Sequence, residues 1–545
     1  MNKTILILLA LFFSYQSIYA QEFVKREGVR LMHHGEEIKL RGFAFGNLVW
    51  ADVPVPSVHH TEEDFLILKN MGMNAVRFYL NYITFEEDDD PYSYKDAGWE
   101  WLDENIKWAK KHGIYLILNI HVPQGGFQSM CEGDALWNEY ENQDRLVGLW
   151  KAIAERYKDE PQIAGYDILN EPIPTTSVTQ WSQLAQRIID SIRTVDVNHL
   201  IITERAIAVG CDYGFNDGKK NYPDVKEENL MYTVHLYDPF EFTHQNLSWA
   251  KTGDGGKYPD ESQVTPPADL AYATGNYNNP RLESGSSGWK FYEGKPFQVK
   301  ADSLIVGRIV FTASLLGNGK AFFDDLILEE VDQYGTRLRI IQKYDLTGAT
   351  YWYWSEKNDG NYTPQSSGHG DASSVMATGA SGNATVTLAT SAFPVNKGSY
   401  YKVSGWMKGE NIPSGAGASI TTEFYYSPSS SPVFTRNRDY LKSTILNYSK
   451  YVRDLNYPVY FGEFGVARNA FENGKGGELW VKDAIEIFDS LGFHWTYHSY
   501  KESSFGYYDG WLEPTDRSTV NKKLDGVFRK HLQKDVALPK SKKKK

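Results

Sequence analysis

The sequence predicts a (β/α)8 TIM barrel (class α/β) that is interrupted after its sixth strand by an all-β domain of the jelly-roll or β-sandwich type. Two observations predict the barrel: apolar strands alternate with amphipathic helices through the first half of the chain, and the same alternation returns near the C-terminus. A third observation predicts the all-β domain, because the stretch 263–433 is rich in Gly, Ser and Thr and carries short alternating strand patterns. With 545 residues, the chain is long enough for two domains.

Eight apolar segments have the length of barrel strands, and amphipathic helices separate them. One helix places Leu146, Trp150 and Tyr157 on a single face, and the segment Trp181–Ile192 repeats this pattern. Strands this apolar are typical of a parallel sheet that helices cover. The predicted strands are Ile38–Phe45, Ala75–Leu80, Ile114–His121, Ile163–Asn170, Leu200–Thr203, Met231–Tyr237, Val459–Phe464 and Phe493–Tyr500.

The interval between the sixth and seventh strands is much longer than the others. A helical pattern at Leu441–Leu455 precedes the seventh strand, so the insertion lies in the connection that leaves the sixth strand. In a barrel, that connection belongs to the face that carries the active site. The predicted boundaries are a signal peptide at 1–20, a barrel at 21–262 and 434–535, an inserted domain at 263–433 and a basic tail at 536–545.

The N-terminus predicts export, to the outside of the cell, the periplasm or the cell surface. Lys3, the apolar run Ile5–Phe13 and the small residue Ala20 have the order of a secretory signal. No later segment is long enough to span a membrane, and the net charge of −12 argues against nucleic acid as a partner. Cys131 and Cys211 are the two cysteines, and the sequence leaves open whether they pair.

Two of the predicted strands end in a glutamate. Glu171 directly follows the fourth strand, and Glu463 lies near the end of the seventh. Both carboxylates should therefore lie at the C-terminal mouth of the barrel, where a pair of carboxylates can break a glycosidic bond. The competing interpretation is two structural glutamates in ion pairs. We expect no cofactor and no metal, since the acidic run 88–90 is typical of a solvated turn.

The motifs around these glutamates are Asn170–Glu171–Pro172 and Gly462–Glu463–Phe464–Gly465. With these motifs, the barrel segments resemble glycoside hydrolase family 5, the retaining β-glycanases of clan A. The resemblance implies that Glu171 is the catalytic acid/base and that Glu463 is the nucleophile. It also implies substrate-binding roles for other residues at strand ends, namely Arg77, His121, Asn170, His235, Tyr237 and Trp495.

The roles nearest the carboxylates have physical reasons. Arg77 is a suitable charge partner for an anionic Glu463, and Tyr237 a suitable hydrogen-bond donor to it. Asn170 can bind the sugar 2-hydroxyl, an interaction that strengthens in the transition state. An anionic Glu463 also helps to keep Glu171 protonated for its role as an acid.

The remaining candidates are aromatic rings. Trp495 would offer an apolar floor to the sugar, and His121 and His235 would bind hydroxyls or orient the carboxylates, although a buried histidine is more often a core residue. Trp50 and Trp137 lie in loops after the first and third strands, where they would serve either as outer sugar platforms or as packing.

The inserted stretch resembles a carbohydrate-binding module of the jelly-roll type. Tyr400–Lys408 resembles an internal strand of such modules and Ala321–Leu326 their closing strand, in reversed order, which suggests a circular permutation. Candidate sugar-stacking residues, for each of which core packing is the competing interpretation, are Trp289, Trp352, Trp354, Tyr425 and Tyr426.

Together these features predict an exported retaining endo-β-glycanase, most specifically an endo-β-1,4-glucanase (cellulase) acting on β-glucan polysaccharide or oligosaccharide. The segment His121–Phe127 favours glucan, and a β-mannanase or another β-glycan hydrolase of the same family is the alternative. The rival from another class is a non-catalytic polysaccharide-binding surface protein. Loss of either carboxylate would have favoured that rival, and both are present.

Overall fold

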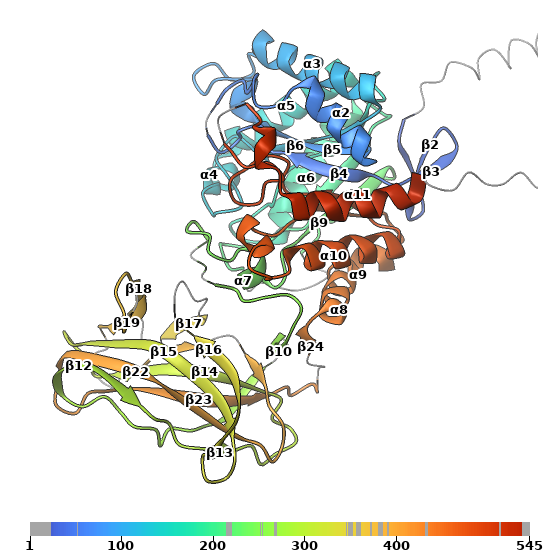
Figure 1. Ribbon diagram of the computed structural model, residues 1–545. Helices are drawn as coiled ribbons and strands as arrows, with labels where there is room; N and C mark the ends of the chain where they lie inside the picture. The colour runs from blue at the N-terminus through green and yellow to red at the C-terminus, as the bar shows by residue number, and fades with distance from the viewer. Residues whose placement is uncertain are drawn as a thin grey trace, which may run out of the picture. The chain divides into compact units, whose positions relative to one another are not determined.

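The computed structural model describes most of the chain, in two compact units (Figure 1). The described residues are 23–51, 53–213, 221–250, 252, 254–265, 270–344, 346, 352–355, 361–370, 373–379, 385–389, 392–430, 434–511 and 514–536. The predicted signal peptide and, apart from Val536, the basic tail lie outside them. In this part of the chain, no helix is long and apolar enough to cross a bilayer. The first unit comprises Met1–Leu236, Ile445–Gly465 and Ala484–Lys545, and the second Tyr237–Thr444 and Val466–Asp483.

A closed parallel barrel forms the centre of the first unit, as the sequence predicts. Going round the barrel, its strands are β25, β26, β4, β5, β6, β7, β8 and β9. Every residue of β5, β7, β8, β9, β25 and β26 is buried, which explains why these segments read as continuous apolar runs. The strands are β4 (Arg41–Phe45), β5 (Ala75–Asn81), β6 (Tyr115–Val122), β7 (Ile163–Asp167), β8 (Leu200–Glu204), β9 (Leu230–Leu236), β25 (Val459–Phe464) and β26 (His494–Tyr497).

A small antiparallel sheet, which the sequence did not predict, closes the N-terminal end of this barrel. It consists of β1 (Lys25–Glu27), β2 (Arg30–His33) and β3 (Glu36–Ile38). Its residue Leu31 packs in one apolar cluster with Ala75 and Leu200, the first residues of β5 and β8. The opposite end of the barrel, where the strands point, is therefore the end left for a site.

Helices surround the barrel strands (Figure 1). The first of them begins where Asp64 accepts a hydrogen bond from the Thr61 backbone N–H at 2.8 Å and ends at Gly72, whose φ of +91° suits glycine. The single helix predicted at Leu441–Leu455 is instead two helices that meet at Ser449. Along the whole described chain, the helices are α2 (Glu62–Met71), α3 (Asp96–His112), α4 (Asp134–Asn138), α5 (Tyr140–Tyr157), α6 (Val178–Arg193), α7 (Phe240–Thr243), α8 (Arg438–Tyr448), α9 (Lys450–Asp454), α10 (Gly477–Leu491), α11 (Lys522–Val536), and the 3-10 turns η1 (Tyr82–Thr84), η2 (Arg468–Phe471) and η3 (Arg517–Thr519). Of these, α7, η2, most of α8 and the first half of α10 belong to the second unit.

The second unit contains two antiparallel sheets that share one apolar core, so the inserted segment is a β-sandwich. Phe311 and Phe424 of one sheet pack in the same cluster as Phe323 and Val403 of the other. The six-stranded sheet has β11 (Ala271–Gly275), β14 (Val306–Ser314), β17 (Trp352–Ser355), β20 (Thr385–Ala389), β21 (Phe393–Pro394) and β23 (Gly417–Tyr426). The seven-stranded sheet has β12 (Gly285–Tyr292), β13 (Phe297–Gln298), β15 (Lys320–Val331), β16 (Arg337–Tyr344), β18 (Asn361–Gln365), β19 (Ser374–Thr378) and β22 (Tyr400–Ile412).

The two ends of the sandwich segment are joined to each other. Strand β10 (Asp260–Thr265) pairs antiparallel with β24 (Phe434–Arg436), with Thr265 opposite Phe434. In the chain, all sandwich strands lie between the barrel strands β9 and β25. The predicted fold class, a TIM barrel with an all-β domain inserted after its sixth strand, is therefore confirmed.

Candidate active site

Glu463 is held firmly near the C-terminal end of β25. Its side chain is buried, and its Oε1 accepts hydrogen bonds from Arg77 Nη1 and Tyr79 Oη, each at 2.6 Å. Burial by itself would raise the pKa of Glu463, but the positive charges of His235 and His498 outweigh it and hold that pKa well below its usual range. Glu463 is therefore an anion at neutral pH.

Arg77 connects Glu463 to two other parts of the barrel mouth. Its guanidinium is 0% exposed. Its Nε donates to Asp167 Oδ2 at 2.7 Å, and its Nη2 donates to Asn170 Oδ1 at 2.9 Å. The planar fork of donors thus reaches β25, β7 and the loop after β7 at once, which fixes these strand ends relative to one another.

Glu171 follows β7 in a backbone conformation that favours glycine, with φ at +42°. Its backbone N–H donates to Glu204 Oε2 at 2.8 Å, and its own Oε1 lies 2.7 Å from His235 Nδ1. The same Nδ1 lies 3.6 Å from Glu463 Oε2. The imidazole of His235, on β9, therefore lies between the two carboxylates.

Two further histidines flank Tyr79, the residue that donates to the β25 carboxylate. The ring of His121, on β6, stacks on Tyr79 at 3.9 Å, and its Nδ1 lies 3.2 Å from Asn119 Oδ1. Burial lowers the pKa of His121 well below its ordinary value, so this imidazole is neutral. His498, just after β26, lies 3.1 Å from Tyr79 Oη through Nδ1 and 3.1 Å from Glu502 Oε2 through Nε2.

A pair of tryptophans adjoins these rings. Trp50 stacks on Trp511 with ring centroids 5.6 Å apart and an angle of 24°. Trp50 is half-buried and meets His121 edge-on at 5.2 Å. Flat apolar faces of this kind suit the C–H face of a ring-shaped ligand. Of the two tryptophans predicted as outer platforms, Trp50 therefore lies beside the site.

Trp137, the other predicted platform, packs inside the protein. It is only 5% exposed, its Nε1 donates to Gln128 Oε1 at 2.7 Å, and its ring meets Trp181 edge-on at 6.3 Å. A ring that is covered on this scale cannot accept a ligand. Of the two interpretations that the sequence left open for Trp137, packing is the correct one.

The prediction that Trp495 forms the floor of the site is wrong. Trp495 is 0% exposed, stacks on Phe528 of α11 at 5.9 Å, and donates from Nε1 to Asp489 Oδ1 at 3.1 Å. Side chains alternate between the two faces of a strand. Trp495 therefore faces the outer helices, whereas Thr496, which donates to a β25 carbonyl oxygen at 2.6 Å, and His498 face inward.

Asn170 and Tyr237 are the two remaining predicted residues, and only Asn170 is placed in the site. Asn170 lies in the site, where its Oδ1 accepts from Arg77 and its Nδ2 donates to Ser129 Oγ at 3.2 Å. Tyr237 directly follows β9 and belongs to the second unit, where its ring meets His244 at 4.9 Å. The hydrogen bond predicted from Tyr237 to the β25 carboxylate stays a prediction.

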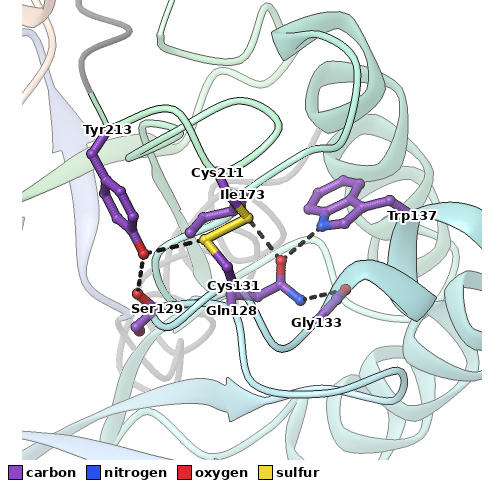
Figure 2. Close-up of a disulfide and its surroundings, with 8 residues drawn as sticks. All are labelled: Gln128, Ser129, Cys131, Gly133, Trp137, Ile173, Cys211 and Tyr213. Atoms are coloured by element: carbon purple, nitrogen blue, oxygen red, sulfur yellow. Dashed lines mark hydrogen bonds between the residues drawn. A yellow bond between two sulfur atoms is a disulfide. The ribbon is translucent and has the colours of Figure 1, made fainter. Parts of the chain in front are cut away.

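A disulfide joins Cys131, in the loop after β6, to Cys211, in the loop after β8, with the Cα atoms 5.9 Å apart. Figure 2 shows that Tyr213, beside this disulfide, donates to the Ser129 carbonyl oxygen, at 2.7 Å. Ser129 is also the residue whose Oγ accepts from Asn170. The disulfide therefore supports a loop that contacts the site directly.

The three groups at the centre of the site are close enough to act together. One ligand atom each from Glu171, His235 and Glu463 lies within 4.8 Å of the others. This spacing would also admit a metal ion, but Glu171 and His235 are hydrogen-bonded to each other, which is typical of an acid–base group. One carboxylate held as an anion and a second paired with an imidazole can supply a nucleophile and a proton donor.

Sequence reasoning missed four residues of the site, three of which carried a signal. Tyr79 lies two positions after Arg77, so both point to the same side of β5. Glu204 ends an apolar strand, which is the pattern that identified the two predicted catalytic carboxylates. His498 lies two positions after Thr496, so both side chains point toward the inside of the barrel. Trp511 lies in a loop and has no periodic signal.

Comparison with known proteins finds one family model that matches part of this chain. Residues 31–278 match the model of a family described as cellulase (glycosyl hydrolase family 5). The match confirms the resemblance drawn from the sequence. It includes Glu171 and ends before Glu463.

Individual relatives are similar over about a third of the chain. Over 192 residues the chain is 30% identical to endoglucanase C of Acetivibrio thermocellus. This alignment covers 35% of this chain and 54% of that protein. It is 33% identical over 190 residues to a beta-xylosidase of Phanerodontia chrysosporium, covering 33% and 38%. The chain thus spans about half the length of the endoglucanase. Among solved structures, Thermotoga maritima Cel5A in complex with cellobiose aligns with a TM-score of 0.47 at 19% identity, over 90% of this chain and 97% of that one.

The disulfide generates a prediction about stability. A cross-link between residues 80 positions apart restricts the unfolded chain. We expect the double variant Cys131→Ser/Cys211→Ser to lose about 2–4 kcal/mol of unfolding free energy. Urea unfolding followed by fluorescence measures this. Adding dithiothreitol should lower the midpoint of the wild type and leave that of the double variant unchanged; equal midpoints without reductant would contradict the prediction.

Proposed function

Residues 31–278 match the cellulase family, and on that premise we propose that the chain is an exported, retaining endo-β-glycanase, most specifically an endo-β-1,4-glucanase that hydrolyses β-1,4-glucan. The observation that carries the proposal is the unequal environment of two carboxylates. Glu463 is kept anionic by the positive charges around it and accepts hydrogen bonds from Arg77 and Tyr79, whereas Glu171 is paired with His235. Carboxylates whose environments differ in this way can take the separate roles of nucleophile and acid/base.

In the first step, Glu463 attacks the anomeric carbon of the bound sugar. Arg77 and Tyr79 both bind its Oε1, and we assign the attack to Oε2. The bond from the anomeric carbon to the leaving oxygen breaks as Glu171 gives that oxygen its proton. The products are a covalent glycosyl ester on Glu463, an alcohol and an ionised Glu171. Asn170 would form a hydrogen bond to the sugar 2-hydroxyl, and this hydrogen bond strengthens in the transition state.

In the second step, Glu171 acts as a base. Its carboxylate removes a proton from a water molecule, whose oxygen attacks the anomeric carbon and displaces Glu463. The ester bond breaks, Glu463 becomes an anion again and Glu171 is protonated for the next cycle. The spacing of the two carboxylates supports this two-step mechanism. One oxygen of Glu171 and one of Glu463 lie within 4.8 Å of each other, which leaves no room for a water molecule between nucleophile and sugar.

The substrate is proposed from the relatives and from the aromatic pair. A relative named endoglucanase points to a glucan, and one named beta-xylosidase points to a β-linked sugar. Trp50, which meets His121 and Tyr79 edge-on, stacks on Trp511, and this aromatic pair suits a chain of sugar rings. A β-mannanase or another β-glycan hydrolase is the alternative, and a panel of polysaccharides assayed for reducing ends distinguishes them.

The inserted sandwich is proposed to bind polysaccharide. An aromatic patch, defined as Trp289, Phe291, Phe322, His369 and Trp406, lies on the seven-stranded sheet and its adjoining loop. The ring of Trp406 stacks on His369 at 3.5 Å and meets Phe291 at 5.7 Å, and Phe291 is 47% exposed. Partly exposed aromatic clusters of this kind mark interaction sites.

The other aromatic candidates of the insert lie elsewhere. Tyr425 is 7% exposed and donates to Glu423 Oε2 at 2.5 Å, so it packs in the interior, while Tyr426 lies beside it on β23, half-buried. Trp352 and Trp354 lie on β17, and their side chains fall outside what the structure describes. Trp289 is therefore the predicted candidate that belongs to the aromatic patch.

The pair of carboxylates generates a kinetic prediction. Glu463→Gln removes the nucleophile and should lower kcat/KM by about 10⁴-fold or more even on an activated nitrophenyl β-glycoside. Glu171→Gln should abolish cellulose hydrolysis but spare part of the nitrophenyl activity, because a good leaving group needs little protonation. As a matched control, Asp489→Asn removes a partly buried, paired carboxylate outside the site and should keep the wild-type kcat. Near-wild-type rates in the Glu463 variant would refute the assignment.

The same mechanism predicts retention of anomeric configuration. Two displacements at one carbon restore its stereochemistry, so the first product from a cello-oligosaccharide should be the β-anomer. Proton NMR during the first minutes, before mutarotation, measures this. An initial α-anomer would mean inversion, and Glu463 would then be a base instead of a nucleophile.

The insert generates a prediction about substrate size. In the variant, an Asn-Gly turn joins Thr265 directly to Phe434, since these residues face each other across β10 and β24. A linked binding surface helps only a substrate long enough to reach both sites, so activity on insoluble cellulose should fall about tenfold more than on cello-oligosaccharides. Trp406→Ala should act in the same direction.

The control for this prediction is Tyr334→Ala, because Tyr334 is an aromatic outside the patch and 84% exposed. It should leave both activities at the wild-type level. Equal loss on both substrates, in a deletion variant that still unfolds in one cooperative transition, would show that the insert is a structural lid and not a binding module.

A further inference from the structure

A third carboxylate lies in the candidate active site and has no part in the double displacement. Glu204 ends β8 and is 0% exposed. Its Oε2 accepts the backbone N–H of Glu171 at 2.8 Å, and its Oε1 lies 3.3 Å from His235 Nε2. Trp181 Nε1, from α6, donates to its backbone carbonyl oxygen at 2.8 Å and so holds this strand end in place. Glu204 thus contacts the proposed acid/base through two routes.

The imidazole that Glu204 contacts is placed between both catalytic carboxylates. His235 Nδ1 lies 2.7 Å from Glu171 Oε1 and 3.6 Å from Glu463 Oε2, while Nε2 faces Glu204. Only the cationic form of histidine carries a proton on both ring nitrogens. A ring with a carboxylate oxygen near each nitrogen is therefore in the surroundings that favour the cation.

We propose that Glu204 is a positioning residue for the hydrolysis, which keeps His235 as an imidazolium cation between Glu171 and Glu463. The proposal rests on the proposed function. During the first step, negative charge leaves Glu463 as its bond to the anomeric carbon forms, and it appears on Glu171 as that group gives up its proton. A fixed cation within reach of both oxygens stabilises the charge before and after this shift, and His235 itself transfers no proton.

Glu204 also fixes the backbone from which the acid/base projects. A glutamate at φ +42° is in a conformation that residues other than glycine rarely adopt, so the surroundings must hold it. The Glu204 carboxylate does so by accepting the Glu171 N–H, at 2.8 Å. A single side chain therefore controls both the orientation of the acid/base and the charge of the imidazole beside it.

The charges around His235 are consistent with the cation. Burial would lower the pKa of His235, but Glu204, Glu463 and Glu171 raise it to about 9. Burial raises the pKa of Glu204 to about 8 although His235 opposes that rise, so the two titrate as a coupled pair. The other titratable groups near this pair are Arg77 and Asp167, with His498 and the neutral His121 beside Glu463. The cation should persist at neutral pH and be lost as the pH rises through about 9.

Nitrogen-15 NMR of protein with labelled histidine tests this without any substrate. The His235 signals are assigned by their absence in His235→Gln. At pH 7 the wild type should show the shifts of an imidazolium, with deprotonation near pH 9. In Glu204→Gln, which keeps an oxygen for the Glu171 N–H, burial should win and His235 should be neutral at pH 7. A neutral His235 in the wild type, or an unchanged titration in the variant, would overturn the proposal.

Kinetics provides the second readout. Glu204→Gln should lower kcat/KM on a nitrophenyl β-glycoside by about 10–100-fold, and Glu204→Asp, which keeps the charge, should restore the imidazolium at pH 7 and most of the rate. Asp489→Asn is the control and should change neither quantity. A shifted His235 titration with unchanged kcat/KM would refute the catalytic role. If Glu204→Gln does not fold, the wild-type titration and Glu204→Asp decide the matter. A wild type inactive on every glycan would instead refute the proposed function and leave the NMR result standing.

Discussion

The guanidinium of Arg77 is buried in the barrel, and a buried charge is tolerated only when anions and hydrogen-bond acceptors surround it. Arg77 meets this need with Asp167 at 2.7 Å, Glu463 at 2.6 Å and Asn170 at 2.9 Å. These partners come from β7, the loop after it and β25, so all of them are satisfied only when the barrel closes in its observed register. The contact that stabilises the mouth of the barrel also keeps Glu463 anionic, and the proposed chemistry depends on that charge.

A second layer of polar contacts holds the strand ends from outside. The indole Nε1 of Trp150 donates to the Ile168 carbonyl oxygen, and that of Trp181 donates to the Glu204 carbonyl oxygen, both at 2.8 Å. Trp495 belongs to the same layer, because its Nε1 donates to Asp489 of α10. Tryptophan is suited to both packing and sugar binding, because the faces of its indole ring are apolar and its Nε1–H donates a hydrogen bond. A high aromatic content therefore does not by itself separate a binding surface from a core.

The β-sandwich has its own apolar core, and its ends meet at the pairing of β10 with β24. An inserted domain whose ends lie close together can occupy a loop without separating the strands on either side. This explains how the barrel keeps its register although the insert is long. The sheet residues of the aromatic patch lie on the face of the seven-stranded sheet opposite its core residues Phe323 and Met407.

The sequence by itself determined the barrel and its two central carboxylates, because an apolar strand that ends in a glutamate is a local pattern. It did not determine which side of the eighth strand faces inward, since a shift of one residue exchanges the two faces, and Trp495 was therefore chosen where His498 is correct. The pairing of Cys131 with Cys211 and the contacts of Glu204 were likewise decided by the tertiary structure. These contacts join residues that are distant in the chain, and only closure of the barrel brings their side chains within hydrogen-bonding distance.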